Sequence, residues 1–437
     1  MLPPNGQRIR SPECSRAGTG PPRQAQRATV RARIASATSS AYGRWTALTG
    51  ALGVALFLCS CLLVRGGPLG STPYGDVHLY ATYGANMAAG QWPYGDFFDE
   101  YPPLAQPLFL LVHYLPGSYG HAFRWTMALF GAAAIALLIA AMASIGASRR
   151  RLLIAAVASG IAPLFVGPIF LNAYDLWPAL LTAAALLAFV QRRERTTYVL
   201  LALAVAAKVY PIVLLPLALI ETWDRGGRVL VRRAALWFVG TLVVVHLPFA
   251  IVGPGGLRFS YWAQLKRGLE VESFGGAVLL VLDRLGVHHV ELRSEPPGST
   301  DVAGGLAHAV ATLSFLLALA ACLLVAWLYL RRRTEPLVAA AAAVVGFVAF
   351  GKVFSPQYVD WLVPLVPAAG AAASALLLGS LALTHVVFDR FHDPGGPGGE
   401  HYKAALAWWI VARDLVVLAL YALLVFLLRR SPRTSSP

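Results

Sequence analysis

Residues 304–330 read GGLAHAVATLSFLLALAACLLVAWLYL, and three arginines, Arg331 to Arg333, follow directly. This stretch holds no Asp, Glu, Lys or Arg. About 20 apolar residues are enough for a helix to cross the hydrocarbon core of a bilayer. A basic cluster at the end of an apolar helix is typical of a short cytoplasmic loop. The stretch therefore predicts a transmembrane helix that ends at the cytoplasmic face.

The whole chain repeats this pattern of long apolar runs separated by short charged runs. It has 437 residues, of which 57% are hydrophobic and 13% are charged, whereas a soluble domain carries about 25% charged residues. Its mean hydropathy is +0.61. The net charge of +15 is explained by basic cytoplasmic loops, so nucleic acid is not an expected partner. The sequence predicts an all-α, polytopic protein of the plasma membrane.

Charge segregation predicts the topology, because the arginine clusters fall on one face of the membrane and most acids on the other. It gives about 10–12 spans, both termini in the cytoplasm and a large first non-cytoplasmic loop from Arg65 to about Tyr101. The arginine clusters lie at 149–151, 192–195, 225–233, 331–333 and 429–433. The expected spans are 46–64, 123–146, a third ending near 171, a fourth ending at 192, then 234–252, 304–330, 337–350, a hairpin pair over 359–388, and 405–428.

Composition divides the chain into an arm, a membrane domain and a tail. Residues 1–44 are rich in Arg, Pro, Ser and Gly, which predicts a disordered basic arm in the cytoplasm. Residues 45–430 form the transmembrane domain, and 431–437 form a cytoplasmic tail. Within the domain, the apolar run 104–115 is too short to cross easily, so an interfacial or re-entrant segment is expected there. Residues 253–303 form a polar, amphipathic region.

Residues 198–220 lie between two basic clusters and allow two interpretations. If both clusters are cytoplasmic, the segment goes out and comes back, and Lys208 and Pro211 break it into two short helices. Broken helices at membrane depth are tolerated only where they line a cavity or are buried in protein. A single span with a different topology is the alternative.

Asp76 is the first candidate for chemistry, because it follows the first span closely and has no basic residue near it in the sequence. A carboxylate there can take a proton from a sugar hydroxyl as a general base. A helix N-cap or a solvated loop acid is the alternative. Further along the loop, Asp96, Glu100 and Tyr101 lie among aromatic side chains, which suit either a sugar-stacking surface or the membrane interface.

Two ionisable residues in or beside apolar runs are further candidates, because charged groups at membrane depth need a partner, water or a ligand. Lys208, with Tyr210 close behind it, can hold an anion such as a phosphate, or it can pair with Asp175 or Glu100. Asp175 can bind a hydroxyl or cap the helix that follows.

A last group of polar residues flanks the later spans: Arg267, Glu272, Lys352, Gln357 and Tyr358. Cations there can hold a lipid phosphate, or they can contact lipid headgroups. The sequence contains no phosphate-cradling glycine loop, HExxH or CxxC motif, which leaves nucleotide chemistry unsupported. Its four cysteines form no cluster with histidines, so neither a metal site nor a cofactor is expected.

Several of these residues lie in stretches that resemble the GT-C superfamily of membrane glycosyltransferases. They are most similar to glycosyltransferase family 87, the polyprenol-phosphate-mannose-dependent α-mannosyltransferases of actinobacteria. The resemblance runs from about residue 70 to 430 in the family's order, and EYPPL together with SPQY is its most specific part. The matching stretches are GQWPYGDF at 90–97, EYPPL at 100–104, NAYDLWP at 172–178, AKVYP at 207–211, ESFGG at 272–276 and KVFSPQY at 352–358.

The resemblance implies a GT-C fold whose first large external loop carries an essential aspartate, which by position is Asp76. It also implies a polyprenyl-phosphate mannose donor, a lipid-linked or glycan acceptor, and no metal. The donor phosphate needs charge stabilisation, which Lys208, Lys352 or Arg267 can supply, and a single displacement would invert the anomeric centre. Arabinose, glucose and galactose remain open as the sugar. A lipid or sugar flippase and a non-catalytic membrane scaffold are the alternative functions.

Overall fold

The computed structural model describes residues 41–66, 75–295, 299–332, 334–391 and 406–430. The chain divides into two units, Met1–Arg44 and Trp45–Pro437. The predicted arm over 1–44 lies outside the described residues up to position 40, and the predicted tail over 431–437 lies outside them entirely. Both therefore stay predictions.

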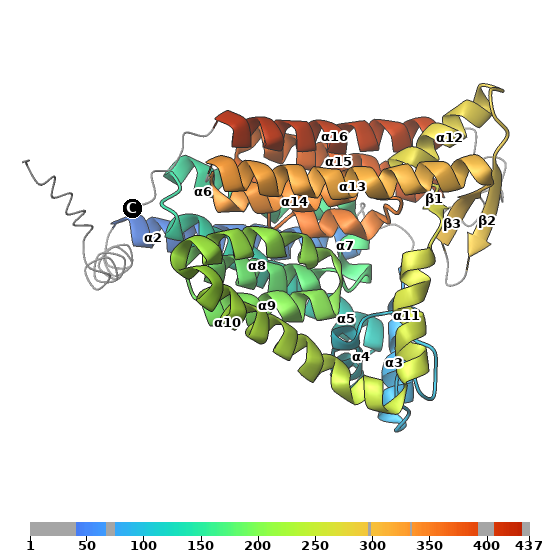
Figure 1. Ribbon diagram of the computed structural model, residues 1–437, viewed down its shortest axis with the longest axis horizontal. Helices are drawn as coiled ribbons and strands as arrows, with labels where there is room; N and C mark the ends of the chain where they lie inside the picture. Colours follow the sequence, from blue (N-terminus) through green and yellow to red (C-terminus); the bar gives the residue numbers. More distant parts are fainter. Residues whose placement is uncertain (1–40, 67–74, 296–298, 333, 392–405, 431–437) are drawn as a thin grey trace, which may run out of the picture. The chain divides into compact units, whose positions relative to one another are not determined.

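The second unit consists almost wholly of helices (Figure 1). Helices suit apolar chain in a membrane, because they satisfy every backbone N–H and C=O within one segment. The longer helices are α2 (Ala41–Gly66), α3 (Val77–Ala88), α5 (Tyr119–Ser144), α6 (Arg149–Val166), α8 (Leu176–Val190), α9 (Glu194–Ala207), α10 (Leu215–Val252), α11 (Pro254–Lys266), α12 (Phe274–Arg284), α13 (Gly305–Arg332), α14 (Pro336–Phe350), α15 (Ala371–Phe391) and α16 (Ala407–Arg430). The shorter ones are α4 (Gln106–His113), α7 (Ile169–Asn172) and the 3-10 turns η1 (Pro103–Ala105), η2 (Tyr210–Leu214), η3 (Pro356–Leu362) and η4 (Val366–Ala369).

These helices form two packed groups, which α6 and α15 join. In one group α8 packs between α5 and α9, and α9 packs against α10. In the other, α14 packs against α13 and α16, and α15 packs against α16. The all-α class is confirmed.

The apolar helices of the described residues fall into long and shorter ones. Among the described residues, 6 helices are long and apolar enough to cross a membrane, and the shorter apolar helices are Pro103–His113, Leu176–Val190 and Pro336–Phe350. The segment expected to be interfacial or re-entrant, 104–115, is confirmed as short, since α4 ends at His113.

The chain breaks at Lys208, as the hairpin interpretation predicted. Helix α9 ends at Ala207, Lys208 itself is extended with φ −160° and ψ 139°, and α10 begins at Leu215. A second interruption lies inside α10, where Gly226 and Gly227 leave helical geometry. The first part of α10 returns alongside α9. A single uninterrupted span over 198–220 is therefore excluded.

The hairpin pair predicted over 359–388 is wrong in its first arm. Only α15 is a regular helix, and residues 356–369 form the two turns η3 and η4 instead. Pro356, Pro364 and Pro367 explain the difference, because proline lacks the N–H that a continuous helix needs. This irregular segment is tolerated because nearly all of it is buried in protein, the condition for irregular backbone at membrane depth.

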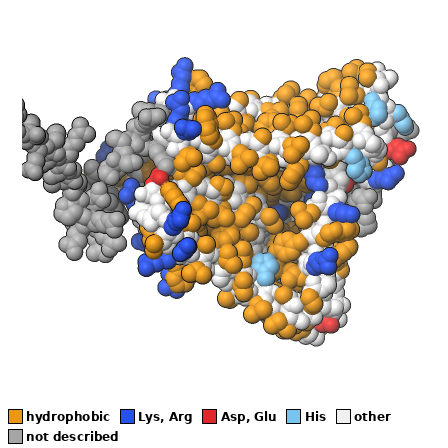
Figure 2. Space-filling model, in the orientation of Figure 1, with side chains coloured by type: hydrophobic (Ala, Val, Ile, Leu, Met, Phe, Trp, Pro, Cys, Tyr) orange, Lys and Arg blue, Asp and Glu red, His pale blue; other side chains and the backbone are white. Residues whose placement is uncertain are grey.

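The arginine clusters gather at one end of the bundle, called here the arginine-rich end (Figure 2). Contacts between clusters distant in the sequence support this. Arg225 pairs with Glu194 at 3.4 Å, and Arg332 donates to the Arg429 carbonyl at 2.6 Å. An apolar surface covers the length of the bundle between the two ends in the same view, as a membrane-embedded bundle requires.

The opposite end carries α3, α4 and α11, together with a small sheet in the order β1-β3-β2 (Figure 1). Its antiparallel strands are β1 (Leu269–Glu270), β2 (Glu291–Glu295) and β3 (Ser299–Ala303), with Glu270 opposite Asp301. The sequence predicts only a polar, amphipathic region here, and its pattern does not indicate the sheet. The sheet matters for function because β1 lies directly after Arg267.

Candidate active site

Asp76 starts α3 and lies against the segment that precedes α8. Its neighbour Gly75 has φ +128°, and a Cβ atom there would lie 2.5 Å from the Asn172 carbonyl oxygen. Only glycine tolerates both the left-handed backbone and so close an approach. This contact places Asp76 beside the polar turn that contains Asp175, although 99 positions separate them in the sequence.

The Asp76 carboxylate accepts hydrogen bonds from two tyrosines. Tyr101 Oη donates to Oδ2 at 3.1 Å, and Tyr80 Oη donates to the same atom at 3.4 Å. Asp76 occupies the N-cap position of α3, but within the described helix its side chain makes no capping hydrogen bond. The carboxylate is thus turned toward the aromatic side chains, and the capping alternative does not hold.

A buried ion pair, formed by Lys208 and Asp175, lies next to the Asp76 carboxylate. Lys208 Nζ is 2.5 Å from Asp175 Oδ1, and the same oxygen accepts a hydrogen bond from Trp361 Nε1 at 2.6 Å. The ammonium group also lies 4.7 Å from the ring centre of Tyr174 and 5.6 Å from that of Tyr358, within the range of cation–π attraction. The ion-pair alternative for Lys208 is therefore the arrangement in the structure.

Stacked rings hold this pair in place. Tyr210 stacks on Trp361 with ring centres 4.0 Å apart, and Tyr358 stacks on Trp361 at 4.1 Å. Tyr210 Oη is hydrogen-bonded to Thr182 at 3.1 Å. Tyr210 is thus a buried support of the site, whereas Tyr358 lies nearer the ammonium group of Lys208.

Electrostatic effects link these groups to Glu100 and Arg267. Burial raises the pKa of the half-buried Glu100 carboxyl to about 7, and the negative charge of Asp76 raises it further, while Arg267 and Lys208 oppose the shift. Such effects require charges that lie close together in a partly desolvated site. Glu100 therefore lies within electrostatic range of Asp76, Lys208 and Arg267, although the four residues come from four separate segments.

Arg267 is fixed by the loop around β1. Its Nη2 donates to Glu270 Oε1 at 3.0 Å. The other oxygen of Glu270 accepts the Phe354 backbone N–H at 2.7 Å. Lys352 Nζ donates to the carbonyls of Leu265 and Arg267, at 2.9 and 2.6 Å. Lys352 therefore supports the Arg267 backbone through its own contacts.

Three predicted residues have other surroundings. Asp96 is exposed, and its Oδ2 accepts the Trp92 backbone N–H at 2.8 Å, so it fixes a turn. Glu272 is buried and pairs with Arg413 of α16 at 2.8 Å. Gln357 lies half-buried in η3, next to Tyr358. Of the predicted set, Asp76, Glu100, Tyr101, Asp175, Lys208, Arg267 and Tyr358 come together.

Sequence reasoning missed several residues of this region. Tyr80, Glu270 and Trp361 carry the hydrogen bonds described above. Asp360 is fully buried, and both its carboxylate oxygens lack a hydrogen-bond partner among the described residues. Arg413 could have been predicted from the sequence. An arginine within an apolar span needs a partner, which is the argument that identified Lys208.

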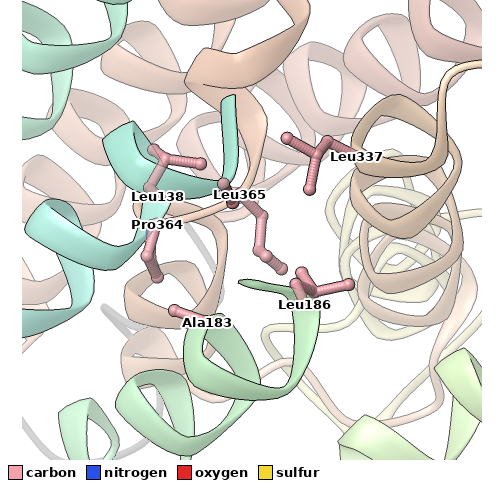
Figure 3. Close-up of a pocket in the computed structure, with 7 residues that line it drawn as sticks. Leu138, Ala183, Leu186, Leu337, Pro364 and Leu365 are labelled. Carbon is pink, nitrogen blue, oxygen red and sulfur yellow. The ribbon is translucent and has the colours of Figure 1, made fainter. Parts of the chain in front are cut away.

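An apolar pocket lies elsewhere in the bundle, between α5, α8, α14 and the segment after η3 (Figure 3). Leu138, Leu186, Leu337 and Leu365 are among its lining residues. Its lining residue Leu138 is about 21 Å along α5 from Arg124. Arg124 marks the site, because its Nε donates a hydrogen bond to Asn172 there. No charged side chain of the described residues lines the pocket, so it has no part in the chemistry of Asp76. Nor do any three His, Cys, Asp or Glu side chains of the described chain come together as a metal site.

An apolar helical bundle with carboxylates, cations and aromatic rings gathered at one end defines the class as a membrane-embedded enzyme. The family model for glycosyltransferase family 87 matches residues 98–356. Because this match covers more than half of the chain, the chain belongs to that family and is a membrane glycosyltransferase. The matched region includes Glu100, Lys208 and Arg267 but not Asp76 or Arg413. A comparison with curated proteins finds no match.

Proposed function

We propose that the chain transfers a sugar from a polyprenyl-phosphate donor to a hydroxyl group of a lipid-linked or glycan acceptor, with Asp76 as general base. The observation that carries this proposal is the position of the Asp76 carboxylate. It accepts hydroxyl hydrogen bonds from Tyr101 and Tyr80 and lies within electrostatic range of Glu100, whose charge Lys208 and Arg267 also influence. A carboxylate set to receive hydroxyl protons, opposite cations set to receive a phosphate, is what such a transfer needs.

The transfer is a single displacement. The acceptor hydroxyl oxygen attacks the anomeric carbon, and the bond from that carbon to the phosphate oxygen breaks. Asp76 takes the hydroxyl proton, and the electron pair of the broken bond leaves with polyprenyl phosphate. Attack from the opposite face inverts the anomeric centre, so a β-linked donor gives an α-linked product. No covalent sugar–enzyme intermediate is required.

Lys208 and Arg267 supply charge stabilisation for the leaving phosphate. They already contact Asp175 and Glu270. A lysine ammonium has three N–H donors and an arginine guanidinium has five, so each retains donors for a phosphate oxygen. In a site that excludes water, donors already held in position are worth more than they are in water. Asp175 and Glu270 then act as the groups that aim the two cations.

The aromatic rings at the site favour a sugar as the bound group. Tyr358, which is partly exposed, lies 5.6 Å from the ammonium group of Lys208, where a sugar attached to the phosphate would rest. Family membership and the sequence resemblance favour mannose, and the acceptor is a glycan or a lipid-linked sugar. We further infer that the site faces the non-cytoplasmic side of the plasma membrane and both termini face the cytoplasm, because the arginine clusters lie at the other end.

A detergent assay tests the proposal. The purified full-length chain is incubated with radiolabelled polyprenyl-phosphate mannose and a lipid acceptor, and labelled product is separated from donor. A transferase forms product without a sealed compartment, whereas a flippase, the alternative function, forms none. A parallel series with glucose, galactose and arabinose carriers identifies the sugar. Absence of product with all four carriers and several acceptors would contradict the proposal.

A further inference from the structure

Arg413 is a buried cation that the proposed mechanism does not use. It lies in α16, about 9 Å along the helix from Ala407 and about 25 Å from Arg430, and its side chain is fully buried. An isolated charge in such surroundings is strongly unfavourable. Its contacts must therefore compensate for the loss of water, and they identify what the residue does.

The guanidinium group of Arg413 makes four contacts. Nη1 donates to Glu272 Oε2 at 2.8 Å, and Nε donates to Asp414 Oδ1 at 2.9 Å. Nη2 donates to the backbone carbonyl of Glu272. The flat face of the group lies 4.0 Å from the ring centre of Phe354. Arg413 thus binds side chain, backbone and ring at once, which a planar fork of donors allows.

These contacts reach the two segments that carry the proposed anion site. Glu272 follows β1, whose Glu270 holds Arg267. Phe354 precedes η3, which carries Tyr358 and Trp361 at the ammonium group of Lys208. The two segments are also joined directly, because Glu270 accepts hydrogen bonds from the Phe354 N–H and from Ser355 Oγ. Arg413 contacts both sides of this junction, through Glu272 and Phe354.

We propose that Arg413 is a positioning residue of the transfer site, which holds the Glu272 and Phe354 segments so that Arg267 and Tyr358 meet the phosphate end of the sugar donor. This inference rests on the proposed function. It extends the site beyond the matched family region, since α16 lies after residue 356. Helix α16 thereby contributes to the binding of the donor.

The experiment compares four full-length variants in detergent with the parent chain. Arg413→Met removes the charge and the donors, and Arg413→Lys keeps the charge but loses the planar fork. Glu272→Gln keeps an acceptor for Arg413. The matched control is Arg430→Met, because Arg430 also lies on α16 and also stacks on a ring, that of Phe426 at 4.3 Å, but at the exposed end.

Two readouts are measured for each variant. The first is KM and kcat for radiolabelled polyprenyl-phosphate mannose. The second is backbone hydrogen exchange of peptides that cover 267–274 and 352–361, with a peptide from 77–113 as internal reference. Arg413→Met should lower kcat/KM by about 100-fold, the effect of a displacement of about 1 Å, mainly through KM. It should also raise exchange in the first two peptides but not in the reference. Arg413→Lys should fall between parent and Arg413→Met. Glu272→Gln should also lose less than Arg413→Met, because its amide oxygen still accepts from Arg413 and Asp414 still pairs with that arginine. Arg430→Met should match the parent in both readouts.

The inference is overturned if Arg413→Met or Arg413→Lys only lowers the yield or the melting temperature while the donor KM and the exchange of both peptides stay at parental values. It is also overturned if Glu272→Gln loses as much as Arg413→Met, since charge rather than the geometry of the hydrogen bonds would then matter. Failure of the proposed function is a different result, because the parent chain itself then forms no product. In that case the exchange measurements still decide whether Arg413 holds the two segments.

Discussion

Lys208 Nζ lies 2.5 Å from Asp175 Oδ1, with 17% of the lysine side chain and 1% of the aspartate side chain exposed. The pair forms where α9 breaks off and α8 begins. The break brings a cation to a depth that an uninterrupted helix would fill with apolar side chains, and Asp175 supplies the opposite charge. The irregular backbone therefore positions the charge that the proposed mechanism needs at the donor phosphate.

Asp175→Asn should destabilise the protein strongly. The substitution leaves Lys208 largely buried without its counter-charge, and removal of one partner from a buried ion pair costs about 3–5 kcal/mol. Thermal unfolding in detergent measures the effect. The double variant Asp175→Asn/Lys208→Met should recover part of the loss, because it removes the orphaned charge. Glu335→Gln is the matched control, since its pair with Arg151 is about one-quarter to one-third exposed and should matter less. Equal losses in both single variants would contradict this account.

Asp76→Asn should fold normally in the membrane but lower transfer by about 100- to 10,000-fold, the usual contribution of a general base. The amide oxygen still accepts the Tyr101 hydroxyl, so the local structure is kept, but it takes no proton. The assay uses lipid-linked donor at saturating concentration. Asp283→Asn provides the control. Asp283 lies on α12, away from Asp76, and accepts a hydrogen bond from the Val290 N–H. Near-normal turnover of the Asp76→Asn variant would show that Asp76 is not the general base.

Gly75→Ala should impair the site without unfolding the bundle. The added methyl group meets the Asn172 carbonyl at 2.5 Å, so Asp76 must move away from Asp175 and Lys208. The expected result is a drop in kcat/KM of about 100-fold, as for other displacements of reacting groups. Gly90→Ala separates the clash from backbone strain, because Gly90 also has positive φ, +87°, but open space around it. If both variants lose activity equally, the close approach to Asn172 is not what positions Asp76.

Glu100 predicts a pH dependence of stability. Burial and the Asp76 charge raise its pKa from 4.5 to about 7, so the folded protein holds a proton that the unfolded chain releases. This contribution is full below the unfolded pKa and is lost as pH rises through about 7. The melting temperature should therefore fall between about pH 5 and pH 8, and Glu100→Gln should weaken that fall.

The pH slope of the melting temperature is weakened rather than abolished, because burial also raises the pKa of the Asp99 carboxyl to about 7. This carboxyl contributes with the same sign. Glu291→Gln is the comparison, since Glu291 is exposed on β2 and its loss should leave the slope as it was. An unchanged slope in Glu100→Gln would contradict the account, because a carboxyl that is charged in both the folded and the unfolded protein contributes no pH dependence.

The sequence predicts those parts of the fold and site that depend on local chemistry. Lys208 and Pro211 mark a break because a charge and a missing N–H both oppose a continuous apolar helix, and the structure has the break there. The segment after Pro356 was misread as half of a helical hairpin. Its apolar composition is the same whether it forms a helix or the buried turns η3 and η4, and only packing by its neighbours makes the irregular form stable.

Long-range pairing explains what else was missed. Glu272 was predicted at the substrate, but its charge is taken up by Arg413, and no local pattern links two residues so far apart. The same holds for Gly75 and Asn172, whose close approach fixes Asp76. Lys352 was expected to bind phosphate, and its ammonium group instead holds carbonyls of the chain. Residue type gave the chemistry of these groups, but tertiary contacts decided their partners.

The contact between Arg413 and Glu272 has a consequence for biosynthesis, because the two residues are 141 positions apart and α16 leaves the ribosome well after the loop that carries Glu272. Chains fold from the N-terminus during synthesis. Until α16 has been inserted, Glu272 lacks the arginine that neutralises it. The nascent chain therefore inserts its earlier helices with one acidic loop still unanchored, and α16 fixes that loop in place when it emerges.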